Sequence, residues 1–222
     1  MGELLKKITK AAGLRLEELA SGDQGEDFYP LLVLFSAILC GYPLDKVLPL
    51  AAGVKFLFWG NVLHRRAVLG SGSKTRSRLL WGDYCYGVLF YLLAEEELRR
   101  CLAPLARVVK AHCEAPFIPS GREFGAAREV LALLGGESCC LPALLAGKKR
   151  WEKELYGFGF AFGQAHALLL SKGMTAEAER VLSEARSYLL SLPGGEGREG
   201  LERLVESLLL IPAQSKECSE AR

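Results

Sequence analysis

The sequence predicts an all-α protein with a single domain, on three observations. Apolar residues recur at helical spacing in nearly every segment, and no stretch alternates apolar and polar residues as a strand would. Half of the 222 residues are apolar and about a quarter are charged, which is typical of a globular chain. The breaks between segments are short, so no linker divides the chain. We expect a helical domain over residues 1–211 and a polar tail over residues 212–222.

The elements before residue 70 are separated by stop signals. Helices are expected over residues 4–12 and 14–20, and the next helix, over residues 29–40, ends at Gly41. The segment over residues 44–69 is apolar nearly all round. Since a helix of that kind packs in the middle of a bundle, we expect this segment to be a core element.

Residues 70–75 form the clearest loop of the chain, and further helices follow it. Gly135-Gly136 is expected to end one of them, and Thr175 is a plausible N-cap for another. The expected helices after the loop cover residues 78–93, 102–113, 122–134, 138–146, 148–171, 175–192 and 198–211.

Two neighbouring helices carry a pattern of residues that resembles the trans-polyprenyl diphosphate synthase family. In that family a hydrophobic helix carries His-Asp-Asp-x-x-Asp, and a helix with Gly-Asp-Tyr follows. Here His64 precedes Arg65 and Arg66, and Gly82-Asp83-Tyr84 follows after the loop. Arg65, Arg66 and Leu69 occupy the positions of the three family acids.

Weaker matches continue the resemblance over roughly residues 30–211. Glu137 and Ser138 stand where the family has Lys-Thr. The segment over residues 156–167 is similar to the helix with Phe-Gln-x-x-Asp-Asp, and His166 and Ala167 fall at its acid pair. The order and spacing of these matches imply an isoprenoid synthase fold, shortened in this chain.

The resemblance also implies a reaction that this chain lacks the residues to perform. In the family, acids at positions i, i+1 and i+4 point into one cavity and hold the magnesium ions that stabilise the leaving diphosphate. Arg65 and Arg66 keep their positive charge and would repel a metal ion. We therefore expect no catalytic residue, no metal site and no cofactor in this chain, with Mg²⁺ held by a catalytic partner.

The basic residues around the loop are candidates for a different role. Arg65 and Arg66 either bind diphosphate or contact acids of a partner subunit, and Lys74, Arg76 and Arg78 would add to the same patch. The alternative is a solvated helix end, where cations complement the helix dipole. The two interpretations are left open here.

Aromatic residues on two of the helices are candidates for a prenyl-binding cavity. The resemblance suggests that bulky side chains limit product length, and the candidates are Phe56, Phe58, Trp59, Phe158, Phe160 and Phe162. The aromatic residues Tyr84, Tyr86, Phe90 and Tyr91 are instead expected in the core.

The three histidines and Asp83 are not interpreted as chemically active residues. We expect His166 to be a hydrogen-bonded core histidine and His112 to be exposed. Asp83 is interpreted as an acid near a helix N-terminus that contacts backbone amides or an arginine, and His64 as a residue packed near a helix end.

The function implied by the resemblance is that of a small, non-catalytic subunit. Such a subunit, component I of a heterodimeric heptaprenyl or hexaprenyl diphosphate synthase, pairs with an Asp-rich catalytic chain that makes the side chain of a quinone such as menaquinone. Its effect on activity or chain length would pass through the subunit interface. The alternative is a stand-alone prenyl-diphosphate-binding protein, or an enzyme with a rebuilt, metal-independent site.

Composition limits the remaining function classes. The net charge of +2, with acids interspersed among most of the bases, gives no reason to expect nucleic acid as a partner. The chain opens without a signal peptide, and its apolar runs are too short or too interrupted for a transmembrane segment. Seven cysteines without a Cys-x-x-Cys pair are typical of buried, reduced thiols. We therefore expect a cytoplasmic protein.

Overall fold

The protein is described by a computed structural model over residues 27–69, 74–115, 123–172 and 175–209. These residues form helices and contain no strand, so the prediction of an all-α fold is confirmed for them. The expected helices over residues 4–12 and 14–20 and the tail over residues 212–222 lie outside the described residues. The elements are α3 (Phe28–Cys40), α4 (Leu44–Leu69), α5 (Lys74–Leu92), the 3-10 helix η1 (Glu96–Cys101), α6 (Leu102–Glu114), α7 (Glu123–Leu145), α8 (Lys149–Lys172), α9 (Ala176–Leu190) and α10 (Glu196–Leu208).

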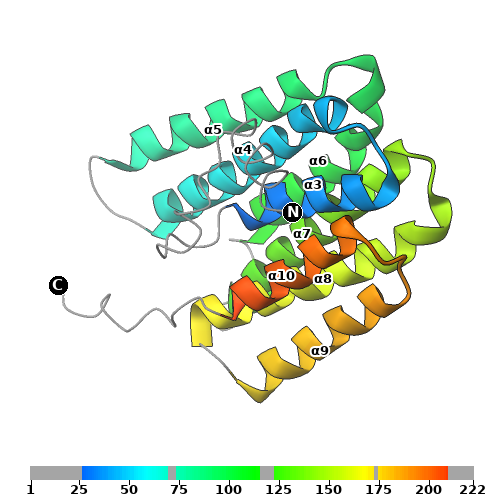
Figure 1. The fold of residues 1–222 in the computed structure, drawn as a ribbon. Coiled ribbons are helices and arrows are strands. Elements are labelled where there is room, and N and C mark those ends of the chain that lie inside the picture. Colours follow the sequence, from blue (N-terminus) through cyan, green and yellow to red (C-terminus); the bar gives the residue numbers. More distant parts are fainter. Residues whose placement is uncertain (1–26, 70–73, 116–122, 173–174, 210–222) are drawn as a thin grey trace.

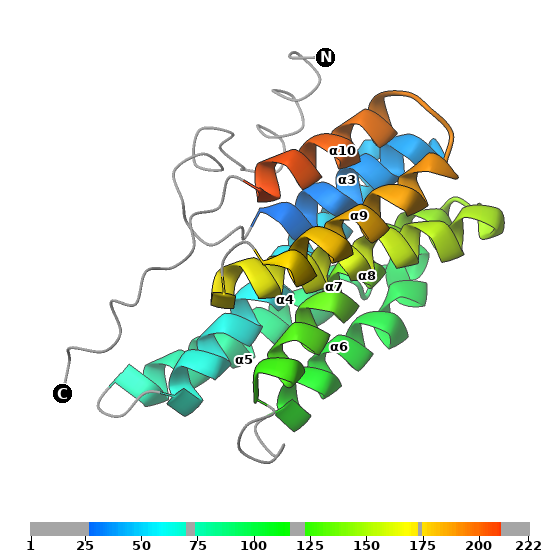
Figure 2. The same ribbon diagram turned by 90° about the horizontal axis from the view of Figure 1, so that it is seen from below.

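Consecutive helices run in opposite directions, and α3 packs against α4, α7 and α10. Figure 1 shows α4 beside α5 and α7 beside α8, with α9 and α10 covering one side of the bundle. In the view from below, α3 lies next to α10 (Figure 2). Contacts join α3 to α4, α7 and α10, which makes this short apolar helix the centre of the core. All residues of α3 from Phe28 to Ala37 are buried.

The helix α4 confirms the expectation of a core element. Val47, Leu50, Val54 and Leu57 have no exposed surface, because the helix is covered by α3 on one side and α5 on another. By length and composition alone, its segment Leu44–Val68 would be able to cross a membrane, and half of that segment is buried inside the protein. Its apolar character is explained by this burial.

The helix α7 corrects one expectation from the sequence. We expected a helix end at Gly135-Gly136 and a second helix over residues 138–146, whereas α7 runs without a break from Glu123 to Leu145. The reason is packing, since Gly135 lies against the backbone of Gly159 in α8. A side chain at either position would overlap the other helix. The two glycines therefore permit a close helix crossing and do not end the helix.

Two expected helix ends are confirmed by their geometry. Gly41 ends α3 with φ of 69°, in the left-handed region that favours glycine, and its N–H donates to the carbonyl groups of Ala37 and Ile38. Thr175 caps α9, since its hydroxyl oxygen accepts a hydrogen bond of 3.2 Å from the N–H of Ala178.

Candidate functional site

The Gly-Asp-Tyr segment of α5 joins that helix to the end of α4. The ring of His64 lies so close to Gly82 that a Cβ atom there would overlap it. The Nε2 atom of His64 is 3.2 Å from Oδ1 of Asp83, and its ring packs at 5.1 Å from the ring of Tyr86. We expected Asp83 to contact backbone amides or an arginine. The side chain near it is instead that of His64. Gly82 and Asp83 act here as a connection between two helices.

His112 of α6 lies against the same connection and is not the exposed residue we expected. Its ring centroid is 6.3 Å from that of His64. Burial, assisted by electrostatic interactions with His64 and Arg65, lowers the pKa of His112 to about 4. His112 is therefore neutral at physiological pH.

The basic candidates lie around the end of the α4–α5 hairpin. Arg78 donates a hydrogen bond of 3.1 Å to the carbonyl oxygen of Arg66, and so binds a free carbonyl group at the C-terminus of α4. Arg65 and Arg66 of α4 and Arg76 of α5 have exposed side chains. The side chain of Lys74 lies outside the described part. Whether these arginines contact diphosphate or a partner stays a prediction.

The segment that resembles the second family motif lies in α8, where the side chains of Tyr29 and His166 are packed in the core. Tyr29 of α3 is fully buried, and a hydrogen bond of 3.0 Å joins its hydroxyl oxygen to Nδ1 of His166. The other face of Tyr29 stacks on Phe58 of α4, with ring centroids 5.4 Å apart. Tyr29 thus joins α4 to α8. The interpretation of His166 as a hydrogen-bonded core histidine is confirmed.

The six prenyl-cavity candidates fall into three groups by burial. Phe58, Phe158 and Phe162 are buried in the core, while Phe56 and Phe160 are half-buried and Trp59 is exposed. Phe28 fills the space beside Phe162, with ring centroids 5.5 Å apart. A role for these residues in product length stays a prediction.

The position of the family's Lys-Thr pair carries a buried acid. Glu137 of α7 accepts a hydrogen bond of 2.9 Å from Nη2 of Arg107, which reaches over from α6. Burial raises the pKa of Glu137, and Arg107 opposes that shift. Ser138 is also buried, and its hydroxyl donates to the carbonyl oxygen of Leu134. Both side chains are thus engaged within the bundle.

The outer face of α5 corrects a further expectation. Tyr86 lies in the core and donates a hydrogen bond of 2.7 Å to Oδ1 of Asn61, as a core residue should. Tyr84, Phe90 and Tyr91 are exposed, at 58%, 40% and 79%, and our assignment of them to the core was wrong. The sequence did not distinguish the two faces because α5 is apolar on both.

The exposed apolar residues of α5 follow a helical stripe. Leu80, Trp81, Tyr84 and Tyr91 lie on the side turned away from α4, and Gly87 stands between the last two with open space at its Cβ position. An open hollow of about 660 Å³ at the start of the stripe is lined by Arg76, Ser77, Leu80, Trp81 and Tyr84. Large exposed apolar patches of this kind mark interaction surfaces.

A metal centre has no basis in the described residues. Within them, no group of three or more histidine, cysteine, aspartate or glutamate side chains is placed to hold an ion. Cys40, Cys85, Cys101 and Cys139 are buried and free, and burial raises the pKa of each thiol. These cysteines act as small apolar core residues.

The architecture is that of the isoprenoid synthases, an all-α bundle in a short chain of 222 residues. No protein-family model and no curated protein matches the sequence. Solved structures do match the fold, and those named below are all prenyl diphosphate synthases or subunits of one.

Three of these structures show the extent of the similarity. A geranylgeranyl pyrophosphate synthetase from the archaeon Geoglobus acetivorans has a TM-score of 0.71 and 18% identity, covering 94% of this chain and 98% of that chain. The geranyl diphosphate synthase small subunit from Antirrhinum majus has a TM-score of 0.66 and 20% identity, over 80% of this chain and 82% of that one. A heterotetrameric geranyl pyrophosphate synthase from mint matches with a TM-score of 0.64 and 16% identity, over 92% and 96% of the two chains.

Proposed function

We propose that this chain is the non-catalytic small subunit of a heteromeric long-chain polyprenyl diphosphate synthase. The proposal rests on the observed prenyl synthase fold, together with the sequence resemblance that puts Arg65, Arg66, His166 and Ala167 where the family has metal-binding acids. The Antirrhinum small subunit supports it, because this fold also occurs in subunits of multi-subunit synthases. The catalytic partner would carry both Asp-rich motifs and the Mg²⁺ ions, in the cytoplasm, and the product would be the side chain of a quinone such as menaquinone.

The interior of the bundle supports a role without catalysis. Tyr29 lies between Phe58 of α4 and His166 of α8, so a fully buried side chain joins the two helices that would bear the acids. A metal-diphosphate complex requires several carboxylate oxygens around an open space. The hydrogen bond and the ring stacking at Tyr29 serve stability instead.

The outer face of α5 supports a partner. Tyr84, Gly87 and Tyr91, the C-terminal part of the exposed stripe, carry no charge, and Gly87 leaves room for a helix to approach closely. Aromatic residues of this kind supply most of the binding energy at protein interfaces. We assign this stripe as the contact with the catalytic subunit.

The test is reconstitution with an Asp-rich polyprenyl diphosphate synthase from the same organism. Each chain is assayed alone and together for incorporation of isopentenyl diphosphate, and complex formation is followed by size-exclusion chromatography. We expect a stable complex, no activity of this chain alone, and higher activity or a changed product length for the pair. Full activity of the catalytic chain alone, with unchanged products and no complex, would refute the proposal. Magnesium-independent turnover by this chain alone would favour the stand-alone enzyme.

A variant pair locates the interface. Tyr91 is 79% exposed, and burying about 150 Å² of it contributes up to about 4 kcal/mol at 25 cal/mol/Å². We expect Tyr91→Asp to weaken the complex at least a hundredfold. The control is Leu190→Asp on α9, a large apolar residue that is 73% exposed, which should leave the affinity unchanged. Equal loss in both variants would show that the stripe on α5 is not the interface.

A further inference from the structure

The free end of the α4–α5 hairpin combines two chemical features that the proposed function does not use. The hairpin tip comprises Arg65, Arg66 and Val68 of α4 together with Arg76, Leu80 and Trp81 of α5. All six side chains are exposed. In both views the C-terminus of α4 and the N-terminus of α5 protrude beyond the neighbouring helices (Figures 1 and 2).

The first feature is charge of a single sign. Between Asp45 and Asp83 the sequence contains no acid, and its cations are Lys46, Lys55, Arg65, Arg66, Lys74, Arg76 and Arg78. Asp83, the first acid on α5, lies outside the hairpin tip, and its 67% exposed side chain has Oδ1 3.2 Å from Nε2 of His64. Among the described residues, Arg65, Arg66 and Arg76 form no ion pair with a carboxylate. Their charge is therefore directed at solvent.

The second feature is exposed apolar surface between those charges. Val68 and Leu80 are each 60% exposed and Trp81 is 58% exposed. The hollow beside Arg76 is lined by Leu80 and Trp81, so an apolar recess lies directly next to a guanidinium group. Trp81 also packs edge-on against Tyr84, with ring centroids 5.6 Å apart.

We propose that the hairpin tip docks on the surface of an anionic lipid bilayer. Arginines near such a surface are attracted to the negative headgroups, while aliphatic side chains enter the upper acyl region. Tryptophan is the residue that favours the boundary between the two. A protruding hairpin end suits insertion into a fluid surface, whereas the stripe over Tyr84, Gly87 and Tyr91 suits contact with another helix.

The hairpin tip adjoins the proposed subunit contact, because Trp81 packs against Tyr84, but docking on lipid does not depend on that contact. One consequence rests on the proposed function: docking would bring the complex to the bilayer into which a long prenyl product partitions.

The experiment uses the full chain and vesicles of two compositions. Flotation is measured with phosphatidylcholine vesicles and with vesicles containing 30% phosphatidylglycerol (roughly physiological anionic content). We expect binding only to the anionic vesicles, loss of binding at high salt, and a blue shift of tryptophan emission that Trp81→Phe removes.

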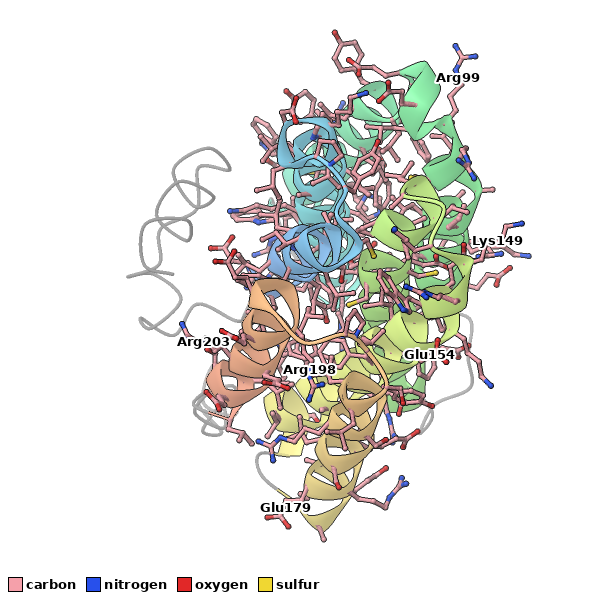
Figure 3. The ribbon with its side chains drawn as sticks, turned by 45° about the vertical axis from the view of Figure 1, so that its right-hand side comes forward. Arg99, Lys149, Glu154, Glu179, Arg198 and Arg203 are labelled. Atoms are coloured by element: carbon pink, nitrogen blue, oxygen red, sulfur yellow. The ribbon has the colours of Figure 1, made fainter. Side chains whose placement is uncertain are left out.

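Two variants and a charge-matched control decide the outcome. Replacing Arg65, Arg66 and Arg76 by Gln should lower the partition coefficient by about a hundredfold or more, since each cation near the surface contributes about fivefold. Leu80→Asp should abolish the emission shift. The control replaces Lys149, Arg150 and Lys153 by Gln; these exposed cations begin α8, at the opposite end of the bundle in Figure 1, and Lys149 points outward in Figure 3.

The results separate this inference from its rivals. The control should bind like the unmodified chain, and so should Tyr91→Asp, which alters only the subunit contact. Equal loss in the control would show general attraction of cations and overturn the inference. No vesicle binding by the unmodified chain would also overturn it, and would leave an acidic protein surface as the occupant of the tip.

Discussion

The crossing of α7 and α8 allows a stability prediction from a single atom. Gly163 of α8 lies on the backbone of α7, and a Cβ atom there would overlap the carbonyl oxygen of Leu131. It would also lie 2.6 Å from the carbonyl carbon of Leu131 and 2.8 Å from Cα of Ala132. Ordinary carbon contacts begin at about 3.5 Å, so the two helices would have to separate by about 1 Å. Both neighbours belong to a helix backbone, and no side-chain rotation relieves the overlap.

The magnitude follows from two opposing contributions. Overpacking of a core costs about 1–3 kcal/mol or more, and an overlap with backbone falls at the upper end. Alanine favours a helix over glycine by about 0.5–1 kcal/mol. We expect Gly163→Ala to lower the free energy of unfolding by about 2 kcal/mol. For a chain of this size, that corresponds to a fall in Tm of about 4–8 °C.

The assay is thermal and urea unfolding followed by circular dichroism, with a matched substitution as the control. Gly125 of α7 is exposed and has open space at its Cβ position, so Gly125→Ala should raise stability by about 0.5–1 kcal/mol. Opposite signs for the two variants would support the close crossing. If Gly163→Ala were as stable as the unmodified chain, the account of α7 and α8 as helices in backbone contact would be wrong.

Two further predictions concern polar groups in the bundle. Because the pKa of His112 is lowered to about 4, the unfolded chain takes up a proton below about pH 6.5 that the folded chain refuses. The free energy of unfolding therefore falls by about 1 kcal/mol per pH unit as the pH drops below 6.5. The urea midpoint of His112→Gln should vary less between pH 7 and 5 than that of the unmodified chain. Tyr29→Phe removes the buried hydrogen bond to His166 and should cost about 1–3 kcal/mol by urea unfolding, whereas Tyr84→Phe on the surface should cost less than about 0.5 kcal/mol. If Tyr29→Phe left the free energy of unfolding unchanged, this hydrogen bond would not stabilise the contact of α3 with α8.

The fold was largely predictable from local patterns. The bounds of α4 were predicted as the structure has them, and the ends at Gly41 and Thr175 agree with the expected signals. These features depend on residues near each other in the chain. Helical periodicity, a glycine in the left-handed region and a hydroxyl cap act within one or two turns, so sequence alone is sufficient to predict them.

The errors share a single cause. Gly135 resembles a helix end when only its neighbours in sequence are considered, because glycine is a poor helix former. Its function depends on Gly159, which lies 24 positions later in the chain and in another helix. Tyr84 and Tyr91 likewise resemble core residues until the partner of each face of α5 is known.

For the candidate site too, residue identities follow from the sequence, whereas contacts follow only from the tertiary structure. The sequence by itself predicted that Arg65, Arg66, His166 and Ala167 replace the acids of the family that it resembles, since the chemical identity of each residue is a local property. Only the tertiary structure decided what fills the space between these positions. Tyr29 reaches His166 across 137 positions of sequence, and His64 meets Asp83 across a helix pair. Long-range contacts of this kind depend on how whole helices pack, and packing is set by the shape of all the side chains together.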